Sequence, residues 1–414
     1  MMTPPSPTTN RRQVALLALT LGVVMLGFGI VIPVYPFYIQ SMGASGKELG
    51  LLIAISPALQ LIFSPIWGMV SDHVGRKPVL MVGILGYGVS MFLFGLATEL
   101  WMLYVFRALG ALLSAATLPT TYAYISDSTT EEDRSGAMGA LGAATGLGMM
   151  LGPAVGGWLG TVSLATPFFI TAAFCLLTLA VIALFLPESL PAEARAAASQ
   201  EDRQLVRPRE LWHALFGPIG ALLVLTSLVM FALGSFQGIF GLYALEEFGF
   251  GTQEVGWIMT GVAVVAALGQ GLLTGPLTRR FGDVRVMRVS FLLSVVSFGL
   301  ILLADNFWTL LLTISFFVLP NSLLRVTVVS LTSQRAEMGK GAAMGLSNSF
   351  TSLGRIVGPV WAGFSYDVDA AYPFWSGAAA MLLGFVVSLV WVQPEQPQNE
   401  AVPLPYPHSR GQSP

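Results

Sequence analysis

Apolar stretches of about 20 residues recur along the whole chain and alternate with short polar segments. A stretch of this length lets a helix cross the hydrocarbon core of a bilayer. Only helices and closed barrels satisfy every backbone hydrogen bond in lipid, so we interpret the stretches as helices. The pattern predicts twelve spans, at 14–39, 48–70, 79–98, 101–125, 136–160, 165–186, 214–243, 253–277, 286–304, 307–332, 341–363 and 372–392.

The composition agrees with a protein that lipid largely covers. Hydrophobic residues make up 54% of the 414 residues and charged residues only 10%, whereas a soluble domain has about 25% charged residues. The net charge of −2 and the lack of a basic cluster with interleaved aromatics argue against a nucleic-acid partner. The sequence offers no nucleophile–base pair and no metal-ligand cluster. We therefore predict an all-α membrane protein that is not an enzyme and needs no metal or cofactor.

The positive charges predict the orientation. Most of the 20 Lys and Arg residues fall in segments that share a side with both chain ends, and the opposite loops carry acids. The positive-inside rule then places both termini in the cytoplasm of a bacterial inner-membrane protein. The expected parts are a cytoplasmic N-terminus, an N-terminal six-helix bundle, a cytoplasmic linker, a C-terminal six-helix bundle and a disordered cytoplasmic tail, at 1–13, 14–186, 187–213, 214–392 and 393–414.

The two halves share motifs at a nearly constant offset. Gly68 begins GMVSDHVG after the second span, and Gly275 begins GPLTRRFG after the eighth, 207 residues later. A Gly-Pro pair at Gly152 in the fifth span recurs at Gly358 in the eleventh, 206 residues later. The repeat predicts two six-helix bundles related by a pseudo-twofold axis along the membrane normal.

These motifs resemble those of the major facilitator superfamily, and more narrowly those of the twelve-span drug:proton antiporters. The likeness covers about residues 12–392. It implies a monomeric secondary transporter that works by alternating access and holds a small molecule near the middle of the bilayer. It also implies a proton gradient as the energy source.

The segment 68–80, GMVSDHVGRKPVL, matches the family motif between the second and third spans. Asp72, at a helix end, can lie against the positive N-terminus of another helix. Arg76 and Lys77 can pair with an acid on a neighbouring span, for which Asp127 is our candidate. Such contacts would lock the halves together on the inner side when the protein faces out. Alternatively, Arg76 and Lys77 only determine the topology.

A second motif lies in the fifth span. The small residues are spaced for close helix contact, and the proline adds a bend. The resemblance implies more, namely a pliable hinge against the eighth span. The residues of this motif are Gly148, Gly152, Pro153, Gly156 and Gly157.

Three arginines fall well inside predicted spans, away from their ends, where each costs about 2.5–3.5 kcal/mol on insertion scales unless it is paired or hydrated. Arg107 lies in the outer part of the fourth span, where the family has a motif that begins with arginine. Gly110 and Ala111 depart from that motif, which puts a proton-transfer role in doubt. Arg325 and Arg355 are predicted to face the substrate cavity. Pairing with backbone carbonyls or water is the alternative for all three.

No span interior contains Asp or Glu, although proton-coupled pumps usually need a carboxylate in the membrane. Gln237 stands where the family often has such a carboxylate, and it cannot titrate. Coupling then uses Asp72 and Asp127 near the inner mouth, or the protein is not a conventional proton antiporter. The excess of positive charge favours anionic or zwitterionic cargo.

Aromatic, amide and cationic groups in an apolar pocket suit bulky organic compounds. Ordinary packing between helices is the alternative. We predict proton-coupled efflux of small organic compounds or drugs. The alternatives are a facilitator or symporter for an anionic metabolite, such as an organic acid or sugar derivative, and a membrane sensor without transport. The predicted cavity residues are Gln60, Tyr122, Gln237, Phe240, Tyr243, Asn321, Arg325, Asn348 and Arg355.

Overall fold

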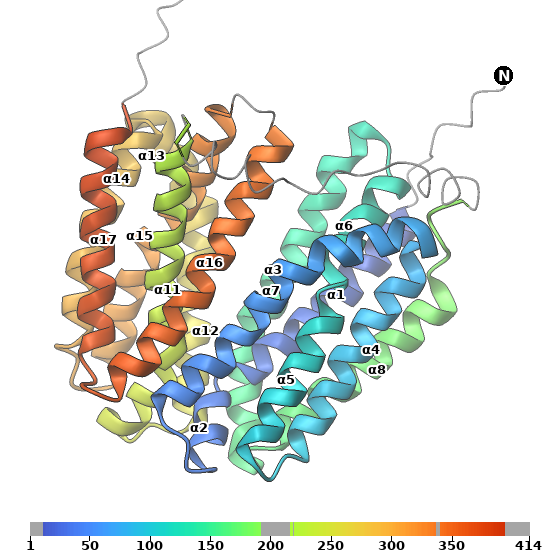
Figure 1. The fold of residues 1–414 in the computed structure, drawn as a ribbon, viewed down its shortest axis with the longest axis horizontal. Helices are drawn as coiled ribbons and strands as arrows, with labels where there is room; N and C mark the ends of the chain where they lie inside the picture. The colour runs from blue at the N-terminus through green and yellow to red at the C-terminus, as the bar shows by residue number, and fades with distance from the viewer. Residues whose placement is uncertain (1–10, 192–215, 218, 337–339, 394–414) are drawn as a thin grey trace, which may run out of the picture.

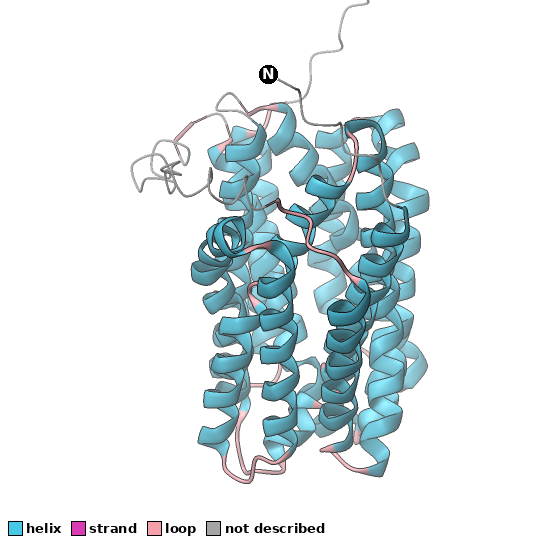
Figure 2. Cartoon of the chain, turned by 90° about the vertical axis from the view of Figure 1, so that its right-hand side faces the viewer, coloured by secondary structure: helices cyan, strands magenta, loops and turns pink. Residues whose placement is uncertain are grey.

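The computed structural model describes residues 11–191, 216–217, 219–336 and 340–393. Within these ranges every regular element is a helix (Figures 1 and 2). The predicted tail from 394 onward, most of the predicted linker and the first ten residues lie outside the described residues.

The first half contains eight helices in the described part of the chain. They are α1 (Arg11–Val31), α2 (Tyr35–Gln40), α3 (Gly46–Val74), α4 (Arg76–Gly95), α5 (Leu100–Ser114), α6 (Thr117–Ser128), α7 (Glu131–Val162) and α8 (Thr166–Phe185). The second half contains α11 (Gly220–Phe248), α12 (Thr252–Leu268), the π-helical turn η1 (Gly269–Leu273), α13 (Thr274–Phe281), α14 (Asp283–Ile301), α15 (Phe307–Gln334), α16 (Lys340–Tyr366) and α17 (Tyr372–Trp391).

Eleven helical segments of the described chain are long and apolar enough to cross a membrane, with α5–α6 and α12–α13 each counted as one. The remaining predicted span, 341–363, corresponds to α16, which is 27 residues long but carries more polar side chains than a typical span. The fold is therefore the predicted all-helical membrane fold, with one span that is less apolar than the others.

Two predicted spans are broken where prolines remove backbone donors. The predicted span 14–39 divides into α1 and α2 around Pro33. The predicted span 101–125 divides at residues 115–116, because Pro119 has no N–H to donate to the carbonyl of Ala115. Ser64 Oγ donates to that carbonyl instead, over 3.3 Å. These breaks correct our reading of both stretches as continuous helices.

The predicted spans seven and eight also differ from the structure. The α11 helix runs from 220 to 248 rather than from 214 to 243, and ends at Gly249, whose φ of 67° is a left-handed cap. The predicted span 253–277 is interrupted by η1, one turn before Pro276. Wide turns of this kind relieve a helix in which a regular backbone bond is missing.

The helices form two bundles (Figure 1). In the first, α1 packs against α7 and α8, and α4 against α5 and α8; in the second, α11 packs against α16 and α17, and α14 against α15 and α17. We call the side where α1 begins and α17 ends the inner side, at the top of Figure 1. The opposite side is the outer side. The ribbons of the two bundles approach each other on the outer side and diverge toward the inner side.

Candidate functional site

The two bundles touch through two helix crossings on the outer side. A Cβ atom on Gly256 of α12 would lie under 3.0 Å from the carbonyl oxygen of Pro153 on α7. A Cβ on Gly50 of α3 would lie equally close to the carbonyl oxygen of Pro359 on α16. Gly256 follows Gly50, and Pro359 follows Pro153, by the same 206 residues. The sequence repeat therefore produces two equivalent helix crossings between the bundles.

The glycine motif of α7 serves two neighbours. Gly152 and Gly156 pack against the backbone of Gly29 and Ile30 in α1, as Gly148 does one turn further inward. Gly157 faces α12, where Thr252 Oγ1 donates to its carbonyl over 2.9 Å. The expected contact with the eighth span is therefore present, and the hinge role stays a prediction.

The inner part of α7 is not packed in this way. Added Cβ atoms on Gly142 and Gly146 would meet nothing within 4 Å. We expected a single stripe of small residues to make helix contacts along this span. On the face that carries Gly142 and Gly146, the structure instead separates a packed outer half from an open inner half, because the bundles diverge there.

Arg76 joins three elements at the inner side of the first bundle. Its Nε lies 2.9 Å from Oδ2 of Asp127, at the end of α6, and its Nη1 lies 2.5 Å from Oδ1 of Asp72 in α3. Nη1 also donates to Ser71 Oγ over 2.7 Å. The Arg76 side chain is only 8% exposed, so its charge depends on these partners. Asp127 is the partner proposed from the sequence.

Glu188 completes this network, although it was not among our predicted site residues. Its carboxylate accepts the backbone N–H groups of Arg76 over 2.9 Å and Lys77 over 3.2 Å, at the start of α4. We expected Asp72 to face a helix N-terminus, and Glu188 takes that position on α4. We expected Lys77 to pair with an acid, whereas its Nζ donates to the carbonyl of Ala183 over 2.8 Å. The Pro-Glu-Ser sequence at 187–189 was the signal, and it is short.

The contacts described above tie together α3, α4 and α6 and the segment after α8, all of them in the first bundle. The inner-side lock between the halves that we expected from the motif is a property of the opposite, outward-facing state. The structure has its cross-bundle contacts on the outer side and therefore leaves that expectation untested.

Arg107 is held by an aromatic side chain near the middle of the first bundle. Its Nη1 donates to the hydroxyl of Tyr35, and its Cζ lies 4.8 Å from the centre of that ring. Beside it is a cavity of about 10 Å³ that Tyr87 and Ser90 also line, with room for about one water molecule. Arg107 Nε and the Tyr87 hydroxyl are buried there without a protein hydrogen-bond partner.

The polar residues of α16 lie on the stripe that makes the outer crossing. Pro359 and Gly363 touch α3, and the positions further inward on the same helical face are Arg355, Ser352 and Asn348. Arg355 and Asn348 are exposed, since the bundles have parted at this level. Arg325 of α15 and Gln237 of α11 are exposed as well. Of the other predicted cavity residues, Tyr122 is 46% exposed and Gln60 is half-buried.

Three of the predicted cavity residues are instead buried within the second bundle. Phe240 packs on Phe236 with ring centres 5.1 Å apart, and Tyr243 packs on Phe374 at 4.7 Å. Asn321 is 1% exposed and donates through Nδ2 to Ser294 Oγ over 3.2 Å. These side chains line no open space in this state. Aromatic and amide groups stabilise helix packing as readily as they bind ligands, and the sequence does not separate the two uses.

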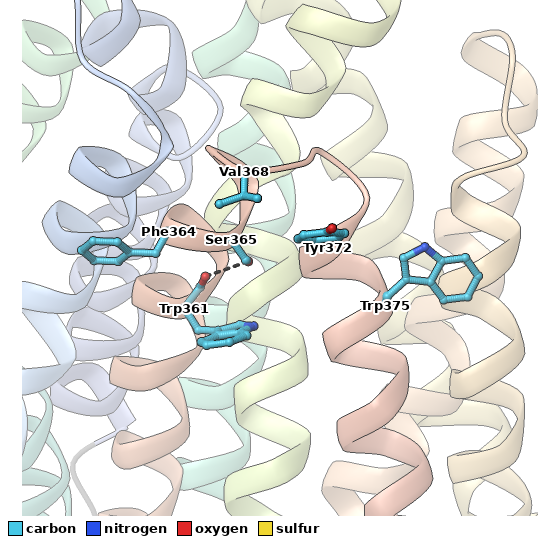
Figure 3. Close-up of a pocket in the computed structure, with 6 residues that line it drawn as sticks. All are labelled: Trp361, Phe364, Ser365, Val368, Tyr372 and Trp375. Carbon is cyan, nitrogen blue, oxygen red and sulfur yellow. Dashed lines mark hydrogen bonds between the residues drawn. The ribbon is translucent and has the colours of Figure 1, made fainter.

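A separate hollow of about 410 Å³ opens between α16 and α17 at their outer ends (Figure 3). All its residues come from the second bundle, so it does not lie between the halves. Its aromatic side chains are typical of the belt that membrane proteins place at the lipid–water interface. The lining residues are Trp361, Phe364, Ser365, Val368, Tyr372 and Trp375.

Two duplicated bundles, sealed to each other on one side and apart on the other, define a membrane transporter of the alternating-access class. The model of the Major Facilitator Superfamily matches residues 17–251 and 222–408. The chain belongs to this superfamily and is an integral membrane transporter rather than an enzyme.

Its relatives include bacterial resistance proteins of nearly the same length. Multidrug resistance protein 1 of Bacillus subtilis is 33% identical over 383 residues, covering 92% of this chain and 96% of the relative. Quinolone resistance protein NorA of Staphylococcus aureus is 27% identical over 380 residues, with 92% and 96% coverage. Among solved structures, an inward-facing bacterial homolog of the human lysosomal transporter Spinster matches with a TM-score of 0.72 and 15% identity, covering 92% of this chain and 95% of that one.

Proposed function

We propose that this protein exports small organic compounds across the bacterial cytoplasmic membrane in exchange for protons. The observation that carries the proposal is the arrangement of the two bundles. The crossings at Gly50 and Gly256 close the outer side. The inner parts of their partner helices α7 and α16, at Gly146 and Asn348, are open. The state is therefore ready to receive a compound from the inner side. The names of the relatives, which refer to multidrug and quinolone resistance, support export of such compounds.

The inner network supplies the proposed gate and the coupling groups. The middle of the described spans holds no Asp or Glu, so we assign coupling to two acids of the inner network, Asp72 and Asp127. Both pair with Arg76, and adding a proton to either removes one of the charges that hold the guanidinium. The released Arg76 would let the start of α4 shift against α3 and α6. Movement of α7 about its glycine motif would then carry the change to the outer crossing.

The proposal also includes the topology and the oligomeric state. Both termini and the linker at 187–213 lie in the cytoplasm, and the protein acts as a monomer of two bundles, 14–186 and 214–392. Arg107, which donates to Tyr35, is the remaining coupling residue of the first bundle.

The test is transport into everted membrane vesicles from expressing cells, with an imposed gradient that is acid inside. Ethidium and norfloxacin accumulation should exceed that of vesicles without the protein, and an uncoupler should abolish the difference. D127N should lose accumulation, whereas K77Q, a charge change next to Arg76 on α4 but outside its ion pairs, should keep it. Accumulation of neither compound, or accumulation that persists with the uncoupler, would contradict proton-coupled export.

The second candidate is a facilitator or symporter for an anionic metabolite. It is favoured by Arg107, Arg325 and Arg355, which lie within spans whose middle has no acid. Substrate uptake that an uncoupler leaves unchanged would favour this second candidate.

A further inference from the structure

Two arginines deep within the described spans of the second bundle, Arg325 and Arg355, form no ion pair with an acid. The ion pairs of the described residues join Lys47 to Glu48 and Arg76 to two aspartates, and none includes Arg325 or Arg355. The α15 and α16 helices contain no Asp or Glu, and the acids of α11 are at its outer end. A guanidinium group at this depth costs free energy unless something compensates its charge.

The two arginines are neighbours. They stand on adjacent helices, α15 and α16. Arg325 is nine residues before the end of α15, and Arg355 is fifteen residues after the start of α16. At 1.5 Å per residue their Cα atoms differ in depth by about 9 Å, a gap that two long side chains can bridge. Two like charges this close favour an anion between them.

Both side chains are exposed on the inner parts of their helices. Arg355 continues the stripe of α16 that touches α3 at Pro359, so it points toward the first bundle at a level where the bundles have parted. Arg325 is four residues after Asn321, which bonds to α14, and three after Ser322, which lies against Gly269 of η1. Arg325 is thus one turn further inward on α15, at the level where the bundles have parted, and is exposed.

The pseudo-symmetry shows that packing does not require these charges. The positions in the first bundle that correspond to Asn348, Ser352 and Arg355, 206 residues earlier, are Gly142, Gly146 and Met149. The first bundle forms the same crossing with α12 without a polar group on that stripe. The polar and cationic stripe is therefore an addition to the second bundle alone, and it has a use other than holding the fold.

We infer that Arg325 and Arg355, with Asn348 and Gln237 beside them, form an anion-binding site that selects organic compounds carrying a carboxylate or sulfonate on an apolar body. Guanidinium groups bind such anions through paired, charge-assisted hydrogen bonds, and the amides add neutral donors. Zwitterions with such a group also qualify. This inference rests on the proposed transport function and specifies its substrate class.

The test measures binding of 2-naphthoate and 2-naphthamide to the full-length protein by titration calorimetry in neutral phosphatidylcholine nanodiscs. The two probes share one ring system and differ by one negative charge. Naphthoate should bind about tenfold more tightly than naphthamide, as one charge-assisted contact provides. R325Q and R355Q should each reduce that preference to about threefold or less. R325K and R355K, which keep the charge, should retain most of it and show that the site is folded.

R279Q is the matched control. Arg279 is an exposed residue of α13 in the same bundle, so its replacement makes the same change in net charge away from the site. It should leave the preference intact. Equal binding of the two probes by the wild-type protein, or a preference that survives R325Q and R355Q, would overturn the inference.

A lipid headgroup offers the same anionic chemistry, and a second arm separates the two sources. If phosphatidylglycerol in the nanodisc abolishes the naphthoate preference through the two arginines, the occupant is a lipid and the substrate claim fails. Ethidium accumulation in everted vesicles is measured in parallel. If the protein exports ethidium with the proton gradient but shows no preference for naphthoate, this inference is wrong and the transport function stands. If it prefers naphthoate but exports no ethidium, the anion site stands and the proposed export is contradicted.

Discussion

Replacing Gly50 by alanine should drive the transporter toward its outward-open state. The added methyl group would lie under 3.0 Å from the carbonyl oxygen of Pro359, where ordinary contacts are 3.4–4 Å. The obstacle is backbone on both sides, so no flexible side chain can give way. The α3 and α16 helices must separate at the outer side, and that separation is the movement that opens the protein outward. The same reasoning applies to Gly256, which forms the other crossing against Pro153.

The magnitude follows from the cost of overpacking, about 1–3 kcal/mol. The inward-open state bears this cost and the outward-open state does not, so the ratio of the two should change by a factor of about 5–150. Gly146 provides the control, since a methyl group there meets nothing within 4 Å. G146A should leave the ratio within about twofold of the wild type, because surface changes of this kind cost less than about 0.5 kcal/mol.

The assay is double electron–electron resonance, which measures the distance between spin labels at T98C and L303C. These are two exposed positions in outer loops of opposite bundles. The native Cys175 is buried, so it competes little for the label. G50A and G256A should each add a longer outer-side distance that the wild type populates weakly. If both variants give the distance distribution of G146A, the outer crossings do not hold the closed state and the reasoning is wrong.

Further predictions concern the charged contacts at both sides. R76Q should lower the free energy of unfolding by about 3 kcal/mol, since it leaves two acids without their partner, whereas K77Q should change it by less than about 0.5 kcal/mol; thermal unfolding in detergent measures both. E188Q should cost about 1 kcal/mol in the same assay, because it removes the charge at the start of α4. D367N should increase the outer-side distance seen by spin resonance, since Asp367 of the second bundle accepts the backbone N–H of Gly46 over 2.7 Å across the outer interface. An unchanged distance would show that this contact does not hold the gate.

The fold was predictable because lipid permits so few solutions. A stretch of 20 apolar residues in a bilayer must be a helix, and the repeated motifs near Gly152 and Gly358 required two related halves. The breaks were not predictable from hydropathy. They depend on whether a neighbour supplies a donor or acceptor, as Ser64 does for the carbonyl of Ala115, and such partners are distant in sequence.

The candidate site was predictable where a charged residue had few possible partners. Arg76 and Asp127 were paired from the sequence because both lie at the inner ends of neighbouring spans. Phe240 and Tyr243 show the limit. Their residue types suit a pocket and a core equally, and only the rotation of α11 about its axis decides which surface they meet. That rotation follows from packing against α16 and α17, which no local pattern encodes.

The duplication helps to separate functional residues from packing residues, because each half can be compared with the other. A position that is small in both halves, such as the pair Gly157 and Gly363, is needed for the crossing that both halves make. A position that is apolar in one half and cationic in the other, such as Met149 and Arg355, indicates a task that only one half performs. By this criterion Asp72 also stands out, because its counterpart 207 residues later is Arg279. The inner network and the arginine pair are thus each confined to one half. If D72N and R355Q prove additive in transport assays, gating and substrate selection are separate tasks divided between the bundles; strong coupling between them would show that one event drives both.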